Sequence, residues 1–523
     1  MINQQEWLRA RKNLLDQVKS QVQVRLGPLT PALRRYAQGL DGEFRGAWRP
    51  SSDAQLSVAL RRARVVLGAD FHAYSQSQRA HVRLLRDQMD ERHVILALEC
   101  LTSDHDEVVR RFLKGQISES RFLEEIDWSK SWGFPWEHYR PLFELAKDRG
   151  FEIRGMNPPH TENLRQRDQW MARRILQWRS QNPDALIYVI VGEFHLAQNH
   201  LPRLLRSRGL LASELMLLFQ DVESLYFKLA KNRREGSVEV LKGASNRFCL
   251  MVSPPWMKWQ SYLIYLEHAY DRDLQEDPAI DYTDHVTSLI KILENDLKIQ
   301  IKKSAVQVFC PNSRTPLSRL KASLPKKFSR ILLYHLEHDL SFLVPERDWL
   351  YLSRATINHA SALAGHFVHA QLCRRKRTLW NQPQDFLPLI WTEAIGFFFS
   401  KWINPKRKSD TLESIRLQLA ARQPSDRGRQ ALLLALDHRL SEVVWVQTGR
   451  TRSSGYKPRD KFAYVEASRI IGTMLGERLF QKVRSGAISL AQLMSYLKFN
   501  IDQKEFNDFY WRVVREIDKD QSS

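Results

Sequence analysis

The sequence has few of the features that mark secreted, disulfide-bonded or membrane-spanning proteins. It contains four cysteines in 523 residues, and no two of them have the spacing of a zinc finger or a redox motif. This excludes a disulfide framework and favours reduced thiols. The polar N-terminal segment has neither the apolar core of a signal peptide nor a lipobox cysteine. The most apolar later stretch, 386–403, is interrupted by Glu393 and Lys401, so it is too short and too polar to span a bilayer comfortably. We therefore expect a cytoplasmic location.

The sequence also lacks the short motifs of several enzyme classes. It has no phosphate-binding P-loop, no glycine fingerprint of a dinucleotide-binding fold and no serine nucleophile elbow. It has no internal repeat and no clear nucleic-acid-binding motif. Lysine and arginine nevertheless outnumber the acids by 80 to 59, which gives a net charge of +21. A basic chain attracts anions, so we expect an anionic small-molecule partner, and association into a homo-oligomer stays open.

Length and hydrophobic pattern predict two domains and a leading segment. A chain of 523 residues with 43% hydrophobic residues is too long for one core and apolar enough to bury more than one. Residues 1–58 are predicted to form an N-terminal helix and a connector, residues 59–255 an α/β domain, and residues 256–523 a mainly helical region. The role of this last region is not indicated by any motif.

Strand-like and helix-like segments alternate in the first half of the chain. Four short apolar runs predict buried strands, at 64–68, 94–99, 151–156 and 186–191, and helical patterns separate them. This alternation predicts an α/β fold with a parallel sheet and flanking helices, which binds ligands at the C-terminal ends of its strands. The second half is predicted to be mainly helical, with helices at 353–373, 384–403, 410–422, 428–446 and 460–500. Two β-like runs, 331–334 and 349–352, interrupt it.

Two of the predicted strands end in an acid followed two residues later by a histidine. Asp70 precedes His72 after the first strand, and Glu193 precedes His195 after the fourth. Because side chains alternate in an extended segment, each acid and its histidine should point the same way. Carboxylates and imidazoles suit a divalent ion such as zinc or manganese, and they suit acid–base catalysis. Two ordinary polar strand ends are the alternative. The candidate metal ligands are His72, His195, Asp70 and Glu193, and the candidate catalytic residues are His72, His195 and Glu193.

Two further charged residues belong to the same predicted edge of the sheet. Glu99 ends the second strand, and a carboxylate buried there would need a partner. Arg167 opens the helix before the fourth strand, where it would either pair with an acid or an anionic ligand, or simply be a charge at a helix start. Asp70, Glu99 and Arg167 are therefore the candidate cofactor-binding residues.

The order of these motifs is similar to that of one known family. The quoted segments are Gly68–Ala69–Asp70–Phe71–His72, Leu98–Glu99, the stretch 132–139 with Pro141, Gly155–Met156–Asn157, Arg167–Asp168 with Met171–Ala172, and Gly192–Glu193–Phe194–His195. Over the N-terminal half they resemble the ChaN-like haem-binding uptake family of the Tiki superfamily. The family's first motif is usually Gly–Glu–x–His, whereas this chain has Ala69–Asp70–Phe71–His72. Aspartate reaches one methylene less than glutamate, so the motif ranks His195 above His72 for ligand binding.

The resemblance implies a haem- or metal-binding protein, with haem or a zinc or manganese ion as cofactor and a pocket at the C-terminal edge of the sheet. It also implies an alternative, a metal-dependent hydrolase of peptidase or esterase type that uses the same residues. A third hypothesis is an interaction protein whose α/β domain has lost its chemistry. Many ChaN-like members are exported lipoproteins, and this chain shows no such signal.

Two weaker patterns lie in the second half. His359, His366 and His369 share one face of a predicted helix, and Glu393 lies on the next helix. Core histidines are the favoured interpretation, and a second metal or haem site is the alternative. An aromatic stripe follows Pro254–Pro255, for which packing between domains is favoured over a flat wall for a porphyrin. The stripe consists of Trp256, Trp259, Tyr262 and Tyr265.

Overall fold

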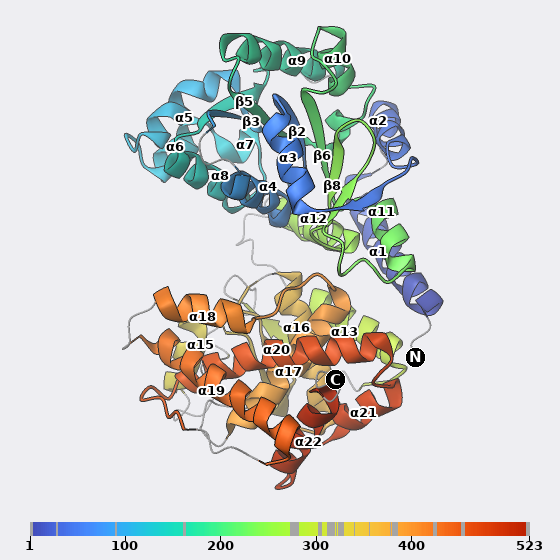
Figure 1. Ribbon diagram of the computed structural model, residues 1–523, viewed down its shortest axis with the longest axis vertical. Coiled ribbons are helices and arrows are strands. Elements are labelled where there is room, and N and C mark those ends of the chain that lie inside the picture. Colours follow the sequence, from blue (N-terminus) through green and yellow to red (C-terminus); the bar gives the residue numbers. More distant parts are fainter. Residues whose placement is uncertain are drawn as a thin grey trace. The chain divides into compact units, whose positions relative to one another are not determined.

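The computed structural model describes two compact units. The α/β unit comprises Arg11–Glu267, and the helical unit comprises Met1–Ala10 with His268–Ser523. The described residues are 4–27, 30–88, 92–159, 164–271, 282–301, 306–310, 320, 322, 329–338, 340–354, 356–376, 378, 385–421, 426–450 and 455–518. Each unit is drawn in Figure 1 and has its own buried core.

In the described part of the α/β unit, eight strands form one sheet in the order β1-β7-β8-β6-β2-β5-β3-β4. Every neighbouring pair from β8 through β6, β2, β5 and β3 to β4 is parallel, whereas β7 pairs antiparallel with β8 and β1. Their bounds are β1 (Arg49–Ser51), β2 (Val65–Asp70), β3 (Val94–Thr102), β4 (Glu152–Asn157), β5 (Leu186–Gly192), β6 (Leu215–Gln220), β7 (Val240–Lys242) and β8 (Arg247–Leu250). The predicted α/β fold with its parallel sheet is confirmed. The sheet also contains β1, β6, β7 and β8, which the sequence analysis did not predict.

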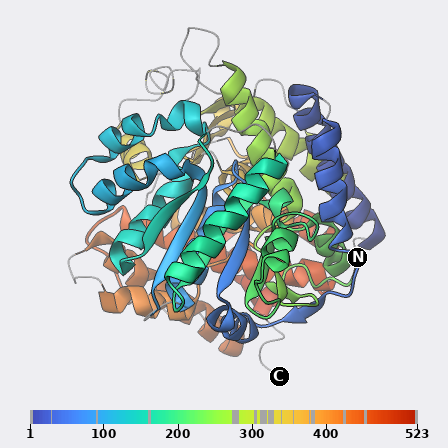
Figure 2. The same ribbon diagram turned by 90° about the horizontal axis from the view of Figure 1, so that it is seen from above.

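Helices cover both faces of this sheet. They are α2 (Pro31–Gly42), α3 (Asp53–Arg62), α4 (Ser75–Gln88), α5 (Asp106–Leu113), α6 (Glu119–Glu125), α7 (Trp128–Ser131), α8 (Trp136–Arg149), α9 (Leu164–Gln181), α10 (Leu201–Ser207) and α11 (Glu223–Lys231), with most of α1 (Gln4–Leu26) and α12 (Pro255–Asp271). Helices α4 and α8 pack together in the core on one face. The chain reverses its direction across the sheet between β4 and β5, so α9 lies on the other face, where it packs on both strands (Figure 2). Coverage on both faces explains why β2 and β5 are continuous apolar runs.

The junction of β3 and β4 depends on one glycine. The pairing of the two strands shifts register between Leu98 and Thr102. At this shift Gly155 of β4 lies so close to Thr102 that a Cβ atom would overlap the Thr102 carbonyl oxygen. Glycine therefore allows the backbones of β3 and β4 to approach three residues beyond Glu99.

The described part of the helical unit is built around α17 (Phe386–Ile403). This helix is buried along most of its length between α16 (Ile357–Leu372) and α20 (Ala463–Ser485). The remaining elements are α13 (Thr283–Leu297), α15 (Ser329–Glu337), α18 (Leu412–Ala421), α19 (Arg427–Thr448), α21 (Leu490–Lys498), α22 (Phe506–Asp518) and the strands β9 (Gln307–Phe309), β10 (Phe342–Val344) and β11 (Trp349–Tyr351). The apolar character of α17 thus belongs to a protein core, and none of the described helices has the length and hydropathy needed to cross a bilayer.

Two local predictions for this unit are wrong. The run 331–334 was expected to be β-like, but it lies inside α15, because a four-residue apolar run cannot distinguish a strand from a buried turn of helix. The pattern over 460–500 was expected to form one helix, but Gly486 ends α20 with a φ of +85°, and α21 begins at Leu490. The strand over 349–352 and the other helices are confirmed where described. Residues 384 and 422, at two predicted helix ends, lie outside the described residues.

Candidate functional site

The C-terminal ends of β2, β5 and β3 bring four of the predicted side chains together. These strands are adjacent in the sheet in that order. Asp70 is the last residue of β2, and His72 follows it. Glu99 lies on β3, and His195 lies in the short 3₁₀ turn η2 (Glu193–Leu196) after β5. Parallel strands end at a common edge, so residues far apart in sequence meet here.

Asp70 and His72 form the first carboxylate–histidine pair of the site. Nδ1 of His72 lies 2.9 Å from Oδ2 of Asp70. The buried Asp70 also accepts hydrogen bonds from the Tyr139 hydroxyl (2.8 Å) and from Nε2 of Gln78 (2.5 Å). Burial by itself would lower the pKa of His72, but the hydrogen bond and charge of Asp70, with the charge of Glu99, raise it above the ordinary value.

His195 forms a second pair, with an acid that the sequence motif did not name. Its Nδ1 lies 2.5 Å from Oδ1 of Asp168, which lies in α9 four residues after its start at Leu164. The Tyr36 hydroxyl donates to the other oxygen of Asp168 over 3.1 Å. Burial opposes protonation of His195, but the hydrogen bonds and charges of Asp168 and Glu99 prevail and raise its pKa to about 9.

Glu99 lies between the two histidines. Its Oε2 is 3.8 Å from Nε2 of His72, and its Oε1 is 3.5 Å from Nε2 of His195. The carboxylate also accepts from the Gly192 backbone N–H (2.6 Å) and from Nη2 of Arg167 (2.5 Å). Burial would raise the pKa of Glu99, but His195, His72 and Arg167 hold it well below its usual range. Glu99 therefore lies within 4 Å of both histidines, with one carboxylate oxygen toward each.

The sequence left open whether Arg167 pairs with an acid or is only a charge at a helix start. In the structure it pairs with Glu99. Besides Glu99, its guanidinium donates to Oδ1 of Asn157 over 2.9 and 3.1 Å. Asn157 in turn donates to the Glu99 backbone carbonyl over 2.6 Å. Arg167 therefore fixes the orientation of Glu99.

Glu193 does not join this group, and the expectation that it points the same way as His195 is wrong. The two residues lie in η2, and alternation of side chains holds only in an extended segment. Nζ of Lys258 donates to Glu193 over 3.2 Å. Lys258 is buried and also lies 5.0 Å from the centre of the Phe71 ring. Asp168 replaces Glu193 as the acid of the second pair. The only sequence signal for it was its place beside Arg167 at the predicted helix start, and the structure begins that helix at Leu164.

Half-buried aromatic rings lie beside His72. Trp132 and Phe134 lie with their ring centres 4.6 and 5.2 Å from the imidazole. Phe134 stacks on Tyr265 of α12 at 4.5 Å, and Tyr262 and Trp259 of the same helix contact Phe71. We call this set the aromatic wall: Phe71, Trp132, Phe134, Trp259, Tyr262 and Tyr265. Trp256, the first residue of the predicted stripe, is instead buried and packs on Tyr226.

The four side chains predicted as metal ligands do not form one coordination sphere. Among the described residues, no three histidine, cysteine, aspartate or glutamate side chains are grouped so that they could hold a metal ion. The geometry gives the reason. Asp70 and Asp168 are each held against a histidine Nδ1, both Glu99 oxygens accept hydrogen bonds, and Glu193 pairs with Lys258.

The surroundings of His72 fit those of a histidine that could hold haem iron. A histidine that ligates iron or another metal usually donates its second ring N–H to a carboxylate or carbonyl, which fixes the tautomer. Asp70 holds Nδ1 of His72 in this way, so Nε2 is the ring nitrogen left for a ligand. The side chain of His72 is 23% exposed, whereas that of His195 is 4% exposed. His72 is therefore the accessible histidine of the two, and the aromatic wall lies beside it.

Comparison with known proteins gave one match. Residues 56–166 match the family described as haem-binding uptake, Tiki superfamily, ChaN. No curated protein and no solved structure was found to match the chain. The matched segment contains Asp70, His72 and Glu99, together with Trp132 and Phe134 of the aromatic wall. It ends one residue before Arg167. The α/β unit is thus similar, over residues 56–166, to the haem-binding uptake family of the Tiki superfamily that includes ChaN.

Proposed function

We propose that the α/β unit binds haem at the C-terminal edge of its sheet, with His72 as the residue that would hold its iron. The observation that carries the proposal is the pairing of a partly exposed, carboxylate-oriented histidine with a wall of half-buried aromatic rings. The porphyrin has two large apolar faces, and aromatic side chains are the surfaces that bury such faces best. The family match over the same segment supports haem as the ligand.

The remaining polar residues would support this histidine. Glu99 keeps Nε2 of His72 near a negative charge, and Arg167 with the Gly192 N–H keeps that charge in place. Each ring nitrogen of His195 faces a carboxylate, Asp168 at Nδ1 and Glu99 at Nε2, so His195 would hold these two acids in position. We propose that these residues set the basicity and orientation of His72, which are the properties that determine how strongly it binds iron.

The test is a titration of the purified full-length chain with haemin, followed by the Soret band. We expect saturable binding at one site and a Soret shift that His72→Ala abolishes. His93→Ala is the matched control, because His93 is an exposed histidine of the same unit whose nearest acid is the half-buried Glu152, 3.9 Å away. Wild-type protein that leaves the Soret band of free haemin unchanged, or a His72→Ala variant that binds like His93→Ala, would contradict the proposal.

The hydrolase alternative has weaker support. A metal-dependent hydrolase needs an ion held by about three protein ligands with an open position for water, and the described residues provide no such group. It is tested on the same preparation by adding zinc or manganese and measuring bound metal together with ester and peptide hydrolysis. Stoichiometric metal that is lost in His72→Ala, with metal-dependent turnover, would favour it over haem binding.

A further inference from the structure

Lys258 is a buried cation close to the candidate site of the α/β unit. It lies on α12, the helix that supplies Trp259, Tyr262 and Tyr265 to the aromatic wall, and it is 5% exposed. Its Nζ donates a hydrogen bond to Oε2 of Glu193 over 3.2 Å. An ammonium group is seldom buried without a carboxylate, because the loss of its hydration has to be offset. The pair with Glu193 therefore accounts for the buried position of Lys258.

Glu193 is the acid that holds this ammonium group. Burial by itself would lower the pKa of Lys258, but the charges of Glu193, Glu223 and Asp221 raise it above the ordinary value, so the amine is protonated. Asp221 is already held by hydrogen bonds from the segment 252–253, and Glu223 by side chains of α1 and α12. Among the residues that the structure describes, Glu193 is the acid within ion-pair distance of Lys258.

The pair joins the strand end that bears the site to the helix that bears the wall. Glu193 begins η2 directly after β5, whereas Lys258 lies near the start of α12. A second tie lies one turn further along α12, where the Ser261 hydroxyl donates to the Ala73 backbone carbonyl over 2.5 Å. Ala73 directly follows His72 in the chain. Helix α12 is thus fixed to the segments that follow both β5 and β2.

The wall residues of α12 lie on the same face of the helix as Lys258. Residues 258, 262 and 265 follow the i, i+4, i+7 spacing that puts side chains on one face. Tyr265 stacks on Phe134 with the ring centres 4.5 Å apart. The Lys258 ammonium lies 5.0 Å from the centre of the Phe71 ring, which Tyr262 contacts edge-on at 5.7 Å. A rotation of α12 about its axis would therefore move both tyrosines away from their partners.

Apolar packing by itself would specify this rotation only weakly. Of residues 256–266, all but Lys258, Gln260 and Ser261 are apolar or aromatic, so apolar side chains are spread around the helix. The hydrophobic effect has no preferred direction, whereas a hydrogen-bonded ion pair does. Lys258 and Ser261 supply the directional contacts of this helix with the sheet edge.

We propose that Lys258 and Glu193 are positioning residues of the haem site, and that their ion pair sets the rotation of α12 that keeps the aromatic wall beside His72. This role rests on the proposed function of the α/β unit, and both residues lie outside the matched segment 56–166. It also gives the acid of the Gly192–Glu193–Phe194–His195 motif a role that requires no contact with the ligand.

The test is haemin titration of the full-length Glu193→Gln and Lys258→Met variants, followed by the Soret band. We expect about tenfold weaker binding in each variant and an unchanged Soret wavelength, because the wall is displaced while His72 is retained. The double variant should lose about as much affinity as either single variant, since both act through one contact. Lys231→Met is the matched control, because Lys231 is an exposed lysine of α11 in the same unit.

Hydrogen exchange of the ligand-free protein measures how firmly α12 is held without the use of haemin. Residues 255–266 should exchange faster in both single variants than in wild type, whereas α5 should be unchanged. Circular dichroism checks folding. The double variant keeps the test decisive if a single variant does not fold, because it leaves neither charge buried without its partner.

Three outcomes would overturn the positioning role and leave the haem proposal standing. They are variants that bind haemin as tightly as Lys231→Met, variants that abolish the Soret shift as His72→Ala should, and unchanged exchange in α12. Wild-type protein that does not bind haemin would contradict the haem proposal and this role together. A failure of the positioning role alone is therefore distinguishable, because it appears in the variants while the wild type still binds.

Discussion

His72 and His195 have the same kind of partner and very different access to solvent. Each has a carboxylate at Nδ1 and Glu99 near Nε2. His195 is almost fully enclosed, whereas about a quarter of the His72 side chain is exposed beside the aromatic wall. We infer that His72 contacts the ligand and that His195 holds the acids in place.

This division of roles predicts opposite effects of the two alanine variants. His195→Ala leaves Asp168 and Glu99 buried without their shared cation, so we expect it to lower the free energy of unfolding by about 3 kcal/mol or more. His72→Ala should lower it less and should cost more haemin affinity. Chemical denaturation and haemin titration of both variants measure this. The sequence motif ranks His195 first for binding, and a folded His195→Ala variant with the larger loss of haemin affinity would show that ranking to be correct.

At the scale of elements, the β3–β4 junction has no space for a side chain at position 155. Gly155→Ala places a methyl group against the Thr102 carbonyl, which is backbone and cannot rotate away. We expect a loss of about 2–3 kcal/mol of stability from this overpacking. Gly46→Ala is the matched control, because a Cβ atom there would have nothing within 4 Å. Thermal unfolding compares the two variants, and equal melting temperatures would show that the junction relaxes easily.

A buried ionic network joins α19, α20 and α22. Oε2 of Glu442 lies 2.7 Å from Arg439 and 3.0 Å from Arg478, and its Oε1 accepts from the Tyr510 hydroxyl over 2.7 Å. Asp518 of α22 binds the same two arginines. Because Glu442 is fully buried, loss of its charge would leave two cations without their central partner.

The network predicts a pH dependence for the helical unit. Burial would raise the pKa of Glu442, but Arg478, His438 and Arg439 lower it to about 2. A carboxyl whose pKa is lower in the folded chain stabilises the fold above its unfolded pKa of about 4.3 and loses that contribution as the pH falls toward 2. Glu442→Gln should cost about 3 kcal/mol at pH 7 and should flatten the stability profile between pH 5 and about 2. Denaturation series at several pH values measure both, and an unchanged slope in the variant would contradict the assignment.

At the scale of the whole molecule, the chain forms two units with separate cores. We therefore expect two transitions in scanning calorimetry, since each core can lose its packing independently. Gly155→Ala should lower the melting temperature of one transition, and Glu442→Gln that of the other. A single transition that both variants lower equally would mean that the two units unfold together.

The features that depend on neighbouring residues could be predicted from the order of amino acids alone. Continuous apolar runs separated by helical patterns were enough for the parallel sheet, because a strand covered on both faces must be apolar throughout. The positions of His72, Glu99 and His195 at one edge followed from that order, since parallel strands end together. Where a local pattern was too short to be decisive, as at 331–334, the same reasoning failed.

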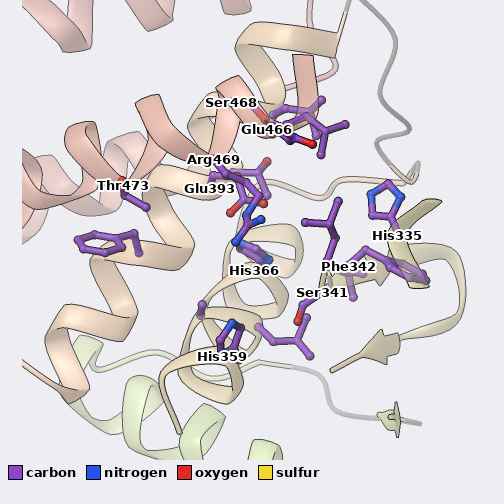
Figure 3. A pocket seen from close by; sticks show the side chains of 18 of the residues that line it. His335, Ser341, Phe342, His359, His366, Glu393, Glu466, Ser468, Arg469 and Thr473 are labelled. Atoms are coloured by element: carbon purple, nitrogen blue, oxygen red, sulfur yellow. Dashed lines mark hydrogen bonds between the residues drawn. The ribbon is translucent and has the colours of Figure 1, made fainter. Parts of the chain in front are cut away.

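Which side chains are partners depends on how the elements pack in three dimensions. Asp168 replaces Glu193 beside His195 because η2 turns the backbone, and Arg167 reaches Glu99 from a helix on the other face of the sheet. In the helical unit, Gly396 of α17 allows the imidazole of His366 to lie against that helix, beside the pocket drawn in Figure 3. These pairings join residues tens of positions apart, and their distances depend on register, helix packing and turn geometry. A periodic sequence pattern specifies which face of an element is buried but not the residue that it meets there.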